Sequence, residues 1–341
     1  MAKKVILTGD RPTGNLHLGH WIGSLESRVE LQSTYDQYVM VADVQALTDY
    51  FGNPKKVVDN VLEIVADYLA VGIEPELTTI FIQSEVSALP ELTAYYMNLI
   101  SVSRLERNPT VKAEIEQKGF GESIPTGFFC YPLSQTADIT AFKAELIPVG
   151  EDQLPMIELT NEVVRKFNRL YSTDCLKESE AYLSSVGRLV GIDGKSKASK
   201  SLNNAIFLSD SPEIIREKVY SMFTDPGHIR ISDPGKVEGN VVFVYLDAFC
   251  DEKEEISLLK EKYSRGGLGD TTLKSLLNDV LQKKLKPIRE KRESLSKKYL
   301  FDICFEGTQK AKSVAQKTLQ EVKEAIGIDY FYKNPCDSRV F

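Results

Sequence analysis

The chain has 341 residues, of which 42% are apolar, and a formal net charge of −7. This length suits two globular domains with real cores, and no apolar run approaches the roughly 20 residues that a membrane span needs. The negative charge excludes a protein that coats nucleic acid in bulk, so a bound polyanion must meet a local basic patch. Five widely spaced cysteines without a Cys-x-x-Cys pair predict neither a disulfide framework nor a thiolate metal site. Because the first residues lack the apolar core of a signal peptide, we expect a cytoplasmic protein.

The start of the chain predicts a strand, a loop and a helix. A short apolar run at 5–7 predicts a buried strand, and residues 8–14 are a cluster of turn residues. Apolar residues then recur at helical spacing, so His17 and His20 fall in the first helical turn. Backbone N–H groups and the helix dipole favour an anion there, and Gly19 leaves room for a flat base or ribose. Alone, the two histidines fit surface or capping roles equally well.

Strands and helices alternate over the next segment of the chain. Residues 38–42 predict a second strand, followed by a polar turn at 43–49, and residues 79–83 predict a third strand. Between them, Pro54 opens a long amphipathic helix that ends near Gly72. This alternation predicts an α/β fold with a parallel sheet and helical crossovers, in which ligands bind beside the carboxyl ends of the strands.

The segment after the third strand predicts helices and one loop. A helix is expected over 91–107, with Pro109 stopping it, and the polar residues 116–123 predict a mobile surface loop. Further on, Gln135 and Asp138 lie one turn apart on a predicted helix that carries several aromatic residues. A paired amide and carboxylate beside aromatic rings suits a flat ligand with an N–H group, although such rings more often belong to the core.

Two later loops offer charged groups to a ligand. A strand predicted at 146–149 leads into residues 150–153, whose carboxylates can hold ribose hydroxyls or an ammonium group, or simply complement the dipole of the next helix. Residues 191–201 form a flexible loop with three lysines separated by small residues, which suits a phosphate chain. The alternative is a solvated surface, but this stretch lacks the helical period and acidic partners of such a surface.

The rest of the chain predicts helices. They are expected from Pro212, over the ambiguous apolar run 241–249, and over the periodic segments 273–285 and 314–326. Basic residues gather at 283–298, and a solvated helix face explains most of them.

Two of these stretches resemble the signature motifs of class I aminoacyl-tRNA synthetases. Residues 17–20 (HLGH) resemble the HIGH signature, and residues 197–201 (KASKS) resemble the KMSKS signature, in the family's order and separation. Between them, three segments look like the tryptophanyl-tRNA synthetase branch, namely LERNPTVK at 105–112, YPLSQTADI at 131–139 and VGEDQ at 149–153. The resemblance covers nearly the whole chain.

The resemblance implies a fold and an assembly. We expect a Rossmann-like parallel-sheet catalytic domain over residues 1–205, with a helical insertion at about 90–140 that forms a homodimer. An all-α anticodon-binding domain is expected over 206–341, and its last helix has room to pack back on the catalytic domain. The basic stretch 283–298 would position tRNA through phosphate contacts, while splayed bases would carry specificity.

The resemblance also implies the site residues. The catalytic groups would be His17, His20, Lys112, Lys197 and Lys200. The ATP site would comprise Arg11, Pro12, Thr13, Gly19, His20, Gly150, Glu151, Asp152, Leu189, Lys197, Ala198, Ser199, Lys200 and Ser201. The tryptophan site would comprise Leu7, Tyr131, Gln135, Asp138 and Gln153, with Asp138 accepting the indole N–H. Mg²⁺ would be held through the ATP phosphates, without a metal site on the protein.

The implied reaction forms tryptophanyl-adenylate and pyrophosphate from tryptophan and ATP. The aminoacyl group then passes to tRNA(Trp). Positioning and charge neutralisation would supply the catalysis. The chain departs from the family pattern at Ala198, which replaces the usual Met, and at Leu7, Gln45 and Gln135 in the expected indole pocket. Three alternatives stay open: the sister tyrosyl-tRNA synthetase, a catalytically idle relative that binds RNA or protein, and a nucleotidyltransferase that is not a ligase.

Overall fold

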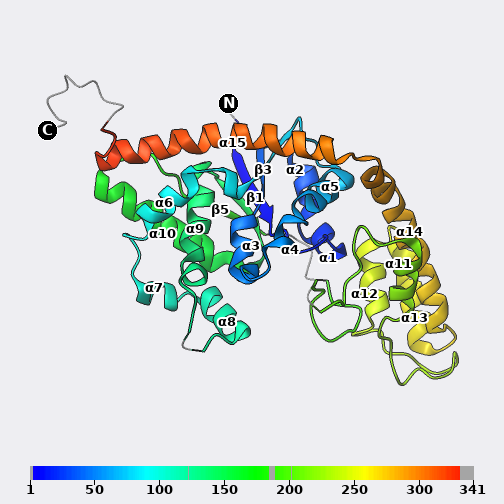
Figure 1. Ribbon diagram of the computed structural model, residues 1–341. Coiled ribbons are helices and arrows are strands. Elements are labelled where there is room, and N and C mark those ends of the chain that lie inside the picture. Colours follow the sequence, from blue (N-terminus) through cyan, green and yellow to red (C-terminus); the bar gives the residue numbers. More distant parts are fainter. Residues whose placement is uncertain (1–2, 122, 184–188, 201, 331–341) are drawn as a thin grey trace.

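The computed structural model describes residues 3–121, 123–183, 189–200 and 202–330. At its centre lies a parallel sheet in which the described strands follow the order β3-β2-β1-β4-β5 (Figure 1). The strands are β1 (Val5–Asp10), β2 (Asp36–Val41), β3 (Thr78–Ile82), β4 (Leu146–Val149) and β5 (Glu180–Leu183). The predicted α/β fold and the first four strands are confirmed. The sequence analysis missed β5, because this short segment is only partly buried and shows no clear alternation.

Each face of the sheet carries its own apolar core. In β2, Tyr38 and Met40 pack into one core, whereas Val39 packs into the other, because successive side chains of a strand point to opposite faces. Helices cover both faces, which explains why β1, β2 and β3 each contain an apolar run that is buried on both sides. Full burial of one such side chain contributes about 1.5–3 kcal/mol. The sheet is therefore a rigid platform for the loops at its ends.

The helices of the first half follow the strands in alternation. They are α1 (Leu18–His20), η1 (Trp21–Leu25), α2 (Glu26–Leu31), α3 (Asp43–Tyr50), α4 (Pro54–Val58), α5 (Val61–Val71), η2 (Gln83–Glu85), α6 (Ala88–Tyr96), α7 (Val102–Glu106), α8 (Pro109–Lys118), α9 (Thr126–Ala141), η3 (Glu151–Gln153) and α10 (Leu154–Tyr171). The helix predicted to end near Gly72 does so, with Gly72 in the left-handed conformation that suits its lack of a side chain.

Three local predictions in this half are wrong. Residues 43–49, expected as a turn, belong to α3, and the helix expected from Pro54 is divided into α4 and α5. The helix expected over 91–107 is likewise divided into α6 and α7.

Pro109 is the first residue of α8 rather than only a stop signal. The side chain of Asn108 accepts a hydrogen bond from Thr110 N at 3.0 Å, so it caps the new helix. The predicted loop 116–123 begins later than expected, because α8 continues to Lys118. Residue 122 lies outside the described residues.

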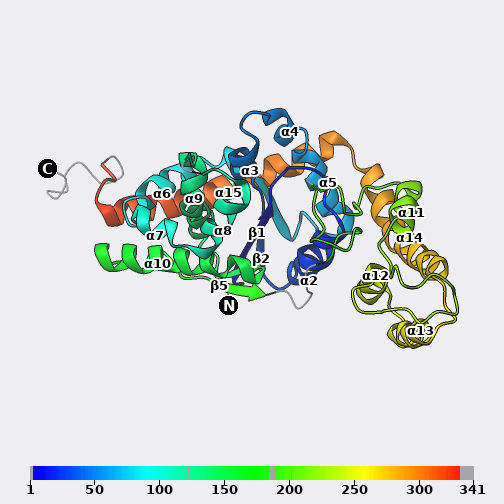
Figure 2. The ribbon, with the colours of Figure 1, turned by 90° about the horizontal axis from the view of Figure 1, so that it is seen from below.

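The described residues from Pro212 onward form helices and their connections, as expected. The helices are α11 (Pro212–Tyr220), α12 (Val241–Phe249), α13 (Lys253–Arg265), α14 (Asp270–Ser294) and α15 (Lys297–Ile326). Figure 2 shows α11 to α14 grouped beyond α5, at the opposite end of the molecule from α10. None of the described helices combines the length and the apolar character that crossing a bilayer requires.

The long helix α15 runs back along β3, the strand at one edge of the sheet (Figure 1). Gly307 allows this close approach, because a Cβ atom there would lie 2.0 Å from the carbonyl oxygen of Ile80. The next residue, Thr308, accepts a hydrogen bond from Ile82 N at 3.1 Å, and Lys323 pairs with Glu91 at 2.9 Å. The last long helix is thus part of the layer that covers the sheet.

The order of the strands fixes where a ligand can bind. From β1 the chain builds one side of the sheet with β2 and β3, and then the other side with β4 and β5. In such sheets the crevice lies outside the carboxyl ends of the two strands at which the order reverses. Here those strands are β1 and β4, which lead into residues 11–17 and 150–153.

Candidate active site

His17 and His20 lie side by side at the end of the β1 loop, with ring centroids 3.9 Å apart. Nδ1 of His17 accepts a hydrogen bond from Gly19 N at 3.1 Å, and Nδ1 of His20 accepts one from His17 N at 3.2 Å. Because each Nδ1 is an acceptor, each neutral ring carries its proton on Nε2. The backbone of this short turn thereby sets the tautomer of both imidazoles.

Both histidines are neutral at pH 7. Burial is the main cause that lowers the pKa of His17 to about 2 and that of His20 to about 4. The positive charges of Lys200 and Lys197 lower both values further, while Asp10 opposes the shift. The pair therefore offers uncharged N–H donors beside cationic lysines, which suits the oxygens of a phosphate group.

The lysine loop lies against the β1 loop, as predicted. Lys200 Nζ donates to the carbonyl oxygen of Gly14 at 2.5 Å. Burial lowers the pKa of Lys200 to about 8, although Asp10 and Asp67 oppose this shift. Two motifs 186 residues apart in the sequence are thus in direct contact. Ser201, expected at the ATP site, lies outside the described residues.

Backbone hydrogen bonds also join the β1 loop and the first helical turn to residues 206–208, which follow the lysine loop. Leu18 N donates to Ile206 O and Leu208 N donates to Leu16 O, both at 2.9 Å. Ala198, which stands where the usual motif has Met, is buried, and its N–H donates to Leu189 O at 3.1 Å. Leu189 in turn lies against Gly19, since a Cβ atom there would be 3.6 Å from Leu189 Cβ.

Asn204 braces the lysine loop from inside, and the sequence analysis missed it. Its Oδ1 accepts from Ser199 N at 2.9 Å, while its Nδ2 lies 3.0 Å from Ser196 Oγ and 3.3 Å from Lys197 O. A Cβ atom on Gly191 would lie 2.2 Å from Nδ2, so the loop backbone closes tightly on this amide. No local pattern in the sequence points to Asn204, because its partners are defined only by the folded loop.

Arg11 is held by a second missed residue. Its guanidinium donates to Asp49 Oδ2 at 2.8 Å, and Lys118 from α8 pairs with the other oxygen of that carboxylate. The adjacent turn is tight, with Thr13 N donating to Arg11 O at 2.8 Å, and Pro12 is buried. Asp49 therefore links the β1 loop to α3 and α8.

The loop after β4 faces the start of α8. Thr110 Oγ1 donates to Asp152 O at 2.7 Å, and Asn108 Nδ2 donates to Pro155 O at 3.1 Å. Within the loop, Gln153 N donates to Gly150 O at 2.9 Å, and Glu151 is exposed. These contacts place α8, and with it the exposed Lys112, beside the loop. No described contact joins Lys112 to either histidine or to Lys200.

Asp138 lies on α9 and is 2% exposed. Both of its oxygens accept from Gln83 Nε2, at 3.0 and 2.9 Å, and Gln83 Oε1 accepts from Gln45 N at 3.1 Å. Burial raises the pKa of Asp138 to about 7, an effect that the hydrogen bond from Gln83 opposes. Gln83 was missed as a site residue, although it is a polar residue at the carboxyl end of β3, where ligands bind.

Of the other predicted pocket residues, Tyr131 and Gln135 lie on α9 before Asp138, and Leu7 lies on β1. Tyr131 is buried beside Phe128, with ring centroids 5.5 Å apart, and burial raises the pKa of Tyr131. Gln135 is half-buried one turn before Asp138, and Leu7 belongs to the core cluster that includes the neighbours of Asp138 on α9.

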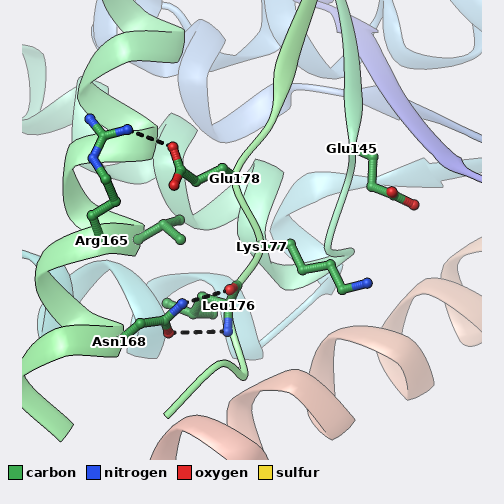
Figure 3. Close-up of a pocket in the computed structure, with 7 residues that line it drawn as sticks. Glu145, Arg165, Asn168, Leu176, Lys177 and Glu178 are labelled. Carbon is green, nitrogen blue, oxygen red and sulfur yellow. Dashed lines mark hydrogen bonds and ion pairs between the residues drawn. The ribbon is translucent and has the colours of Figure 1, made fainter. Parts of the chain in front are cut away.

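A hollow on the surface lies elsewhere, between α10 and the segment before β5 (Figure 3). Its lining includes Glu145 and Lys177, which precede β4 and β5 and so lie at the amino end of the sheet. Asn168 exchanges two hydrogen bonds with the backbone of Leu176, at 2.8 and 3.4 Å, so its amide is satisfied. The hollow contributes nothing to the site at the carboxyl ends. Among the described residues, no group of three or more His, Cys, Asp and Glu is arranged to hold a metal ion.

The chain is similar to known proteins in which the two motifs that meet here are family signatures. The family described as tRNA synthetases class I (W and Y) matches residues 2–286. The chain therefore belongs to the class I tRNA synthetases of this family, which confirms the family inferred from the two motifs.

Individual relatives show which members of this family the chain is similar to. The tryptophan-tRNA ligase of Clostridium longisporum is 55% identical over 337 residues, which cover 97% of this chain and 99% of the relative. The tryptophan-tRNA ligase of Streptococcus pyogenes serotype M3 is 56% identical over 340 residues, covering 97% of this chain and all of the relative. A crystal structure of tryptophanyl-tRNA synthetase from Campylobacter jejuni, complexed with ADP and tryptophan, has a TM-score of 0.84 at 30% identity and covers 95% of this chain and 99% of that chain.

Proposed function

We propose that this chain is a tryptophan-tRNA ligase that forms tryptophanyl-AMP from tryptophan and ATP and then transfers tryptophan to the 3′ end of tRNA(Trp). The observation that carries the proposal is the contact between Lys200 and Gly14, beside His17 and His20. It joins the two motifs of the family into one phosphate-binding surface. The relatives above, at 55% and 56% identity, carry the name of this activity.

In the first step, a tryptophan carboxylate oxygen attacks the α-phosphorus of ATP. The bond to the oxygen between the α- and β-phosphorus atoms breaks, and pyrophosphate leaves with the electron pair. The neutral Nε2–H groups of His17 and His20 donate to phosphate oxygens, while Lys197 and Lys200 neutralise the charge that develops on pyrophosphate. Arg11, which follows β1, is proposed as a helper at the phosphates, and Lys112, on α8 beside the loop after β4, as a second helper. No covalent enzyme intermediate is required.

The nucleoside half of ATP would lie across the crevice between β1 and β4. Gly19 and Leu189 line the adenine and ribose, with Pro12 and Thr13 beside the phosphates and Gly150 to Asp152 on the ribose side. Ala198, Ser199 and Ser201 are further proposed residues of the ATP site. Mg²⁺ would enter on the ATP phosphates and supply charge neutralisation. The imidazole and ammonium groups around the phosphates are not Mg²⁺ ligands, and so they fit a metal that the nucleotide itself carries.

The amino acid would lie on the α9 side. Asp138 accepts the indole N–H, and Gln83 orients the carboxylate by donating to it. An apolar pocket with a buried acceptor rejects an analogue without the donor, because the acceptor is then left unpaired. Tyr131 and Gln153 would contact the polar end of tryptophan, and Leu7 and Gln135 would shape the wall around the ring.

The second step needs tRNA, for which residues 206–341 are proposed as the anticodon-binding domain and 1–205 as the catalytic domain. The basic residues of α14 other than Arg292, and those at the start of α15, would meet tRNA phosphates. We further propose a cytoplasmic homodimer that forms through the helices after β3. In this region Met97 is 44% exposed and Val102 is 63% exposed, which would suit an apolar interface.

The test is ATP–pyrophosphate exchange with each of the twenty amino acids. Exchange should depend on tryptophan and should be absent with tyrosine. Tyrosine-dependent exchange would assign the chain to the sister activity of its family. No exchange with any amino acid at saturating ATP would favour a protein that binds RNA or protein without catalysis.

A further inference from the structure

A fully buried carboxylate lies behind the β1 loop, and none of the proposed roles above uses it. Asp67, in the middle of α5, has an exposed fraction of 0%. An ionised carboxylate in such a place is unfavourable unless other groups donate to it or pair with it. Its partners therefore show what holds it there.

Asp67 joins two parts of the molecule that are far apart in the sequence. One oxygen, Oδ2, accepts from Leu16 N at 2.8 Å, and the other, Oδ1, accepts from Arg292 Nε at 2.8 Å. Arg292 stands in the last turn of α14 and also pairs with Glu63 of α5. Burial raises the pKa of Asp67, while the Leu16 N–H and Arg292 oppose that shift and favour the charged form.

The position of Leu16 gives this link a role in the site. Leu16 immediately precedes His17, and the carbonyl of Gly14, two residues earlier, accepts from Lys200. The segment 14–17 therefore presents both an imidazole and the contact of the lysine loop. The hydrogen bond that Leu16 N donates to the buried carboxylate of Asp67 restricts where the imidazole of His17 and the carbonyl of Gly14 can lie. Because α14 belongs to the helical region, a shift of α14 would move Arg292 and the carboxylate that holds Leu16.

We propose that Asp67 and Arg292 are positioning residues that set the 14–17 segment for ATP, and that they couple the placement of α14 to the nucleotide site. Neither residue touches substrate in this proposal; both act through Leu16 and His17. The inference rests on the proposed function, because its kinetic readout is tryptophan-dependent adenylate formation. It goes beyond that function by naming the contact through which the helical region acts on the phosphate side of the site.

The first test compares Asp67→Asn and Arg292→Gln with the wild-type chain in ATP–pyrophosphate exchange without tRNA. Asp67→Asn keeps the shape of the side chain but replaces one acceptor oxygen with an amide donor. We expect kcat/KM for ATP to fall by about tenfold or more in each variant, while KM for tryptophan changes by less than about twofold. A link that served only stability would lower the melting temperature and leave the kinetics for ATP unchanged.

The control is Arg165→Gln, which removes one arginine from an ion pair with Glu178 on the surface at the amino end of the sheet (Figure 3). It should leave the kinetics for both substrates unchanged. The double variant Asp67→Asn/Arg292→Gln tests whether the two residues act as one unit. Its loss should be no larger than the loss in the more affected single variant, because the two partners share one interaction.

The outcomes separate the two proposals. If the wild-type chain shows no tryptophan-dependent exchange, the proposed function is wrong. If the wild-type chain is active and both single variants keep its kcat/KM for ATP, the positioning proposal alone is wrong. Strictly additive losses in the double variant would also overturn it. Should Arg292→Gln fail to fold because it leaves the buried carboxylate of Asp67 without its cation, Asp67→Asn decides between the outcomes, since it removes that charge and Arg292 keeps its ion pair with Glu63.

Discussion

The phosphate side and the tryptophan side of the site are built in different ways. On the phosphate side, two loops from distant parts of the chain meet through backbone hydrogen bonds and one lysine contact, and His17 and His20 are kept neutral. On the tryptophan side, one carboxylate stands on a long helix and is held by a single amide, that of Gln83. Binding on the phosphate side therefore depends on the relative position of two loops, whereas binding on the tryptophan side depends on one buried carboxylate.

This difference predicts how each side responds to change. A surface made of two loops can open and close around ATP, so its contribution appears mainly in the rate of adenylate formation. A buried acceptor on α9 has little freedom, so its contribution appears in the discrimination between amino acids. We therefore expect variants on the phosphate side to change the rate of adenylate formation, and variants on the tryptophan side to change the discrimination between amino acids.

The largest effect is expected for Lys200→Ala. Removal of this ammonium group should slow adenylate formation by about 10²–10³-fold, because a preorganised group that stabilises developing charge is lost. The affinity for tryptophan should change little. Single-turnover kinetics with equilibrium binding of tryptophan would measure both quantities. A variant that binds tryptophan poorly but forms adenylate at the normal rate would remove Lys200 from the phosphate side.

The next effect is expected for Asp138→Asn. Loss of the charged acceptor should weaken the selection of tryptophan by about 1–3 kcal/mol. The measurement compares kcat/KM for tryptophan with that for an analogue in which the indole N–H is replaced. The two values should approach each other in the variant. Unchanged discrimination would show that the indole N–H has a different partner.

A smaller, pH-dependent effect is expected for Lys200. Because burial lowers its pKa to about 8, the ammonium charge is present below pH 8 and is lost as the pH rises above that value. The quantity to measure is kcat/KM for ATP, which reports the free enzyme and should fall about tenfold per pH unit above pH 8. Lys200→Arg, which stays charged, should shift this decline to higher pH. The same profile for both proteins would assign the titration to another group.

The smallest effect is expected for Asn204→Ala. The variant loses the hydrogen bonds that brace the lysine loop but keeps every lysine, so we expect KM for ATP to rise by about threefold to tenfold while KM for tryptophan stays constant. Steady-state exchange kinetics would check this. An equal rise in both values would indicate a general loss of folded protein.

The sequence indicates the proposed site residues more clearly than the residues that support them. The histidine pair, the lysine loop and Asp138 lie in segments with recognisable local patterns. Their partners do not: Gln83 is 55 residues from Asp138, and Asp49 is 38 residues from Arg11. Such pairs are defined by strand order and helix packing, which one sequence does not contain. Asn204, only a few residues from the lysine loop, was missed because amides are common in loops.

The helix boundaries were mispredicted for a related reason. Residues 43–49 contain polar residues that also favour turns, but α3 packs against neighbouring elements, and tertiary contacts override weak local preference. At Pro109, two rules for proline applied at once. The preceding helix ends before it, and a new helix begins with it, because proline is favoured at the first helical position. The rule that a helix ends before proline predicted the end of α7 but not the start of α8.

The position of α15 along β3 has a consequence for synthesis of the chain. Among the described strands, none lies beside the outer edge of β3, and Ile82 N donates there to the side chain of Thr308. An unprotected strand edge can pair with other chains. During translation this edge therefore remains unprotected until Thr308 has left the ribosome, long after the sheet residues have emerged. Nascent chains arrested before that point should be captured by chaperones or aggregate, even though they contain every residue assigned to the ATP and tryptophan sites.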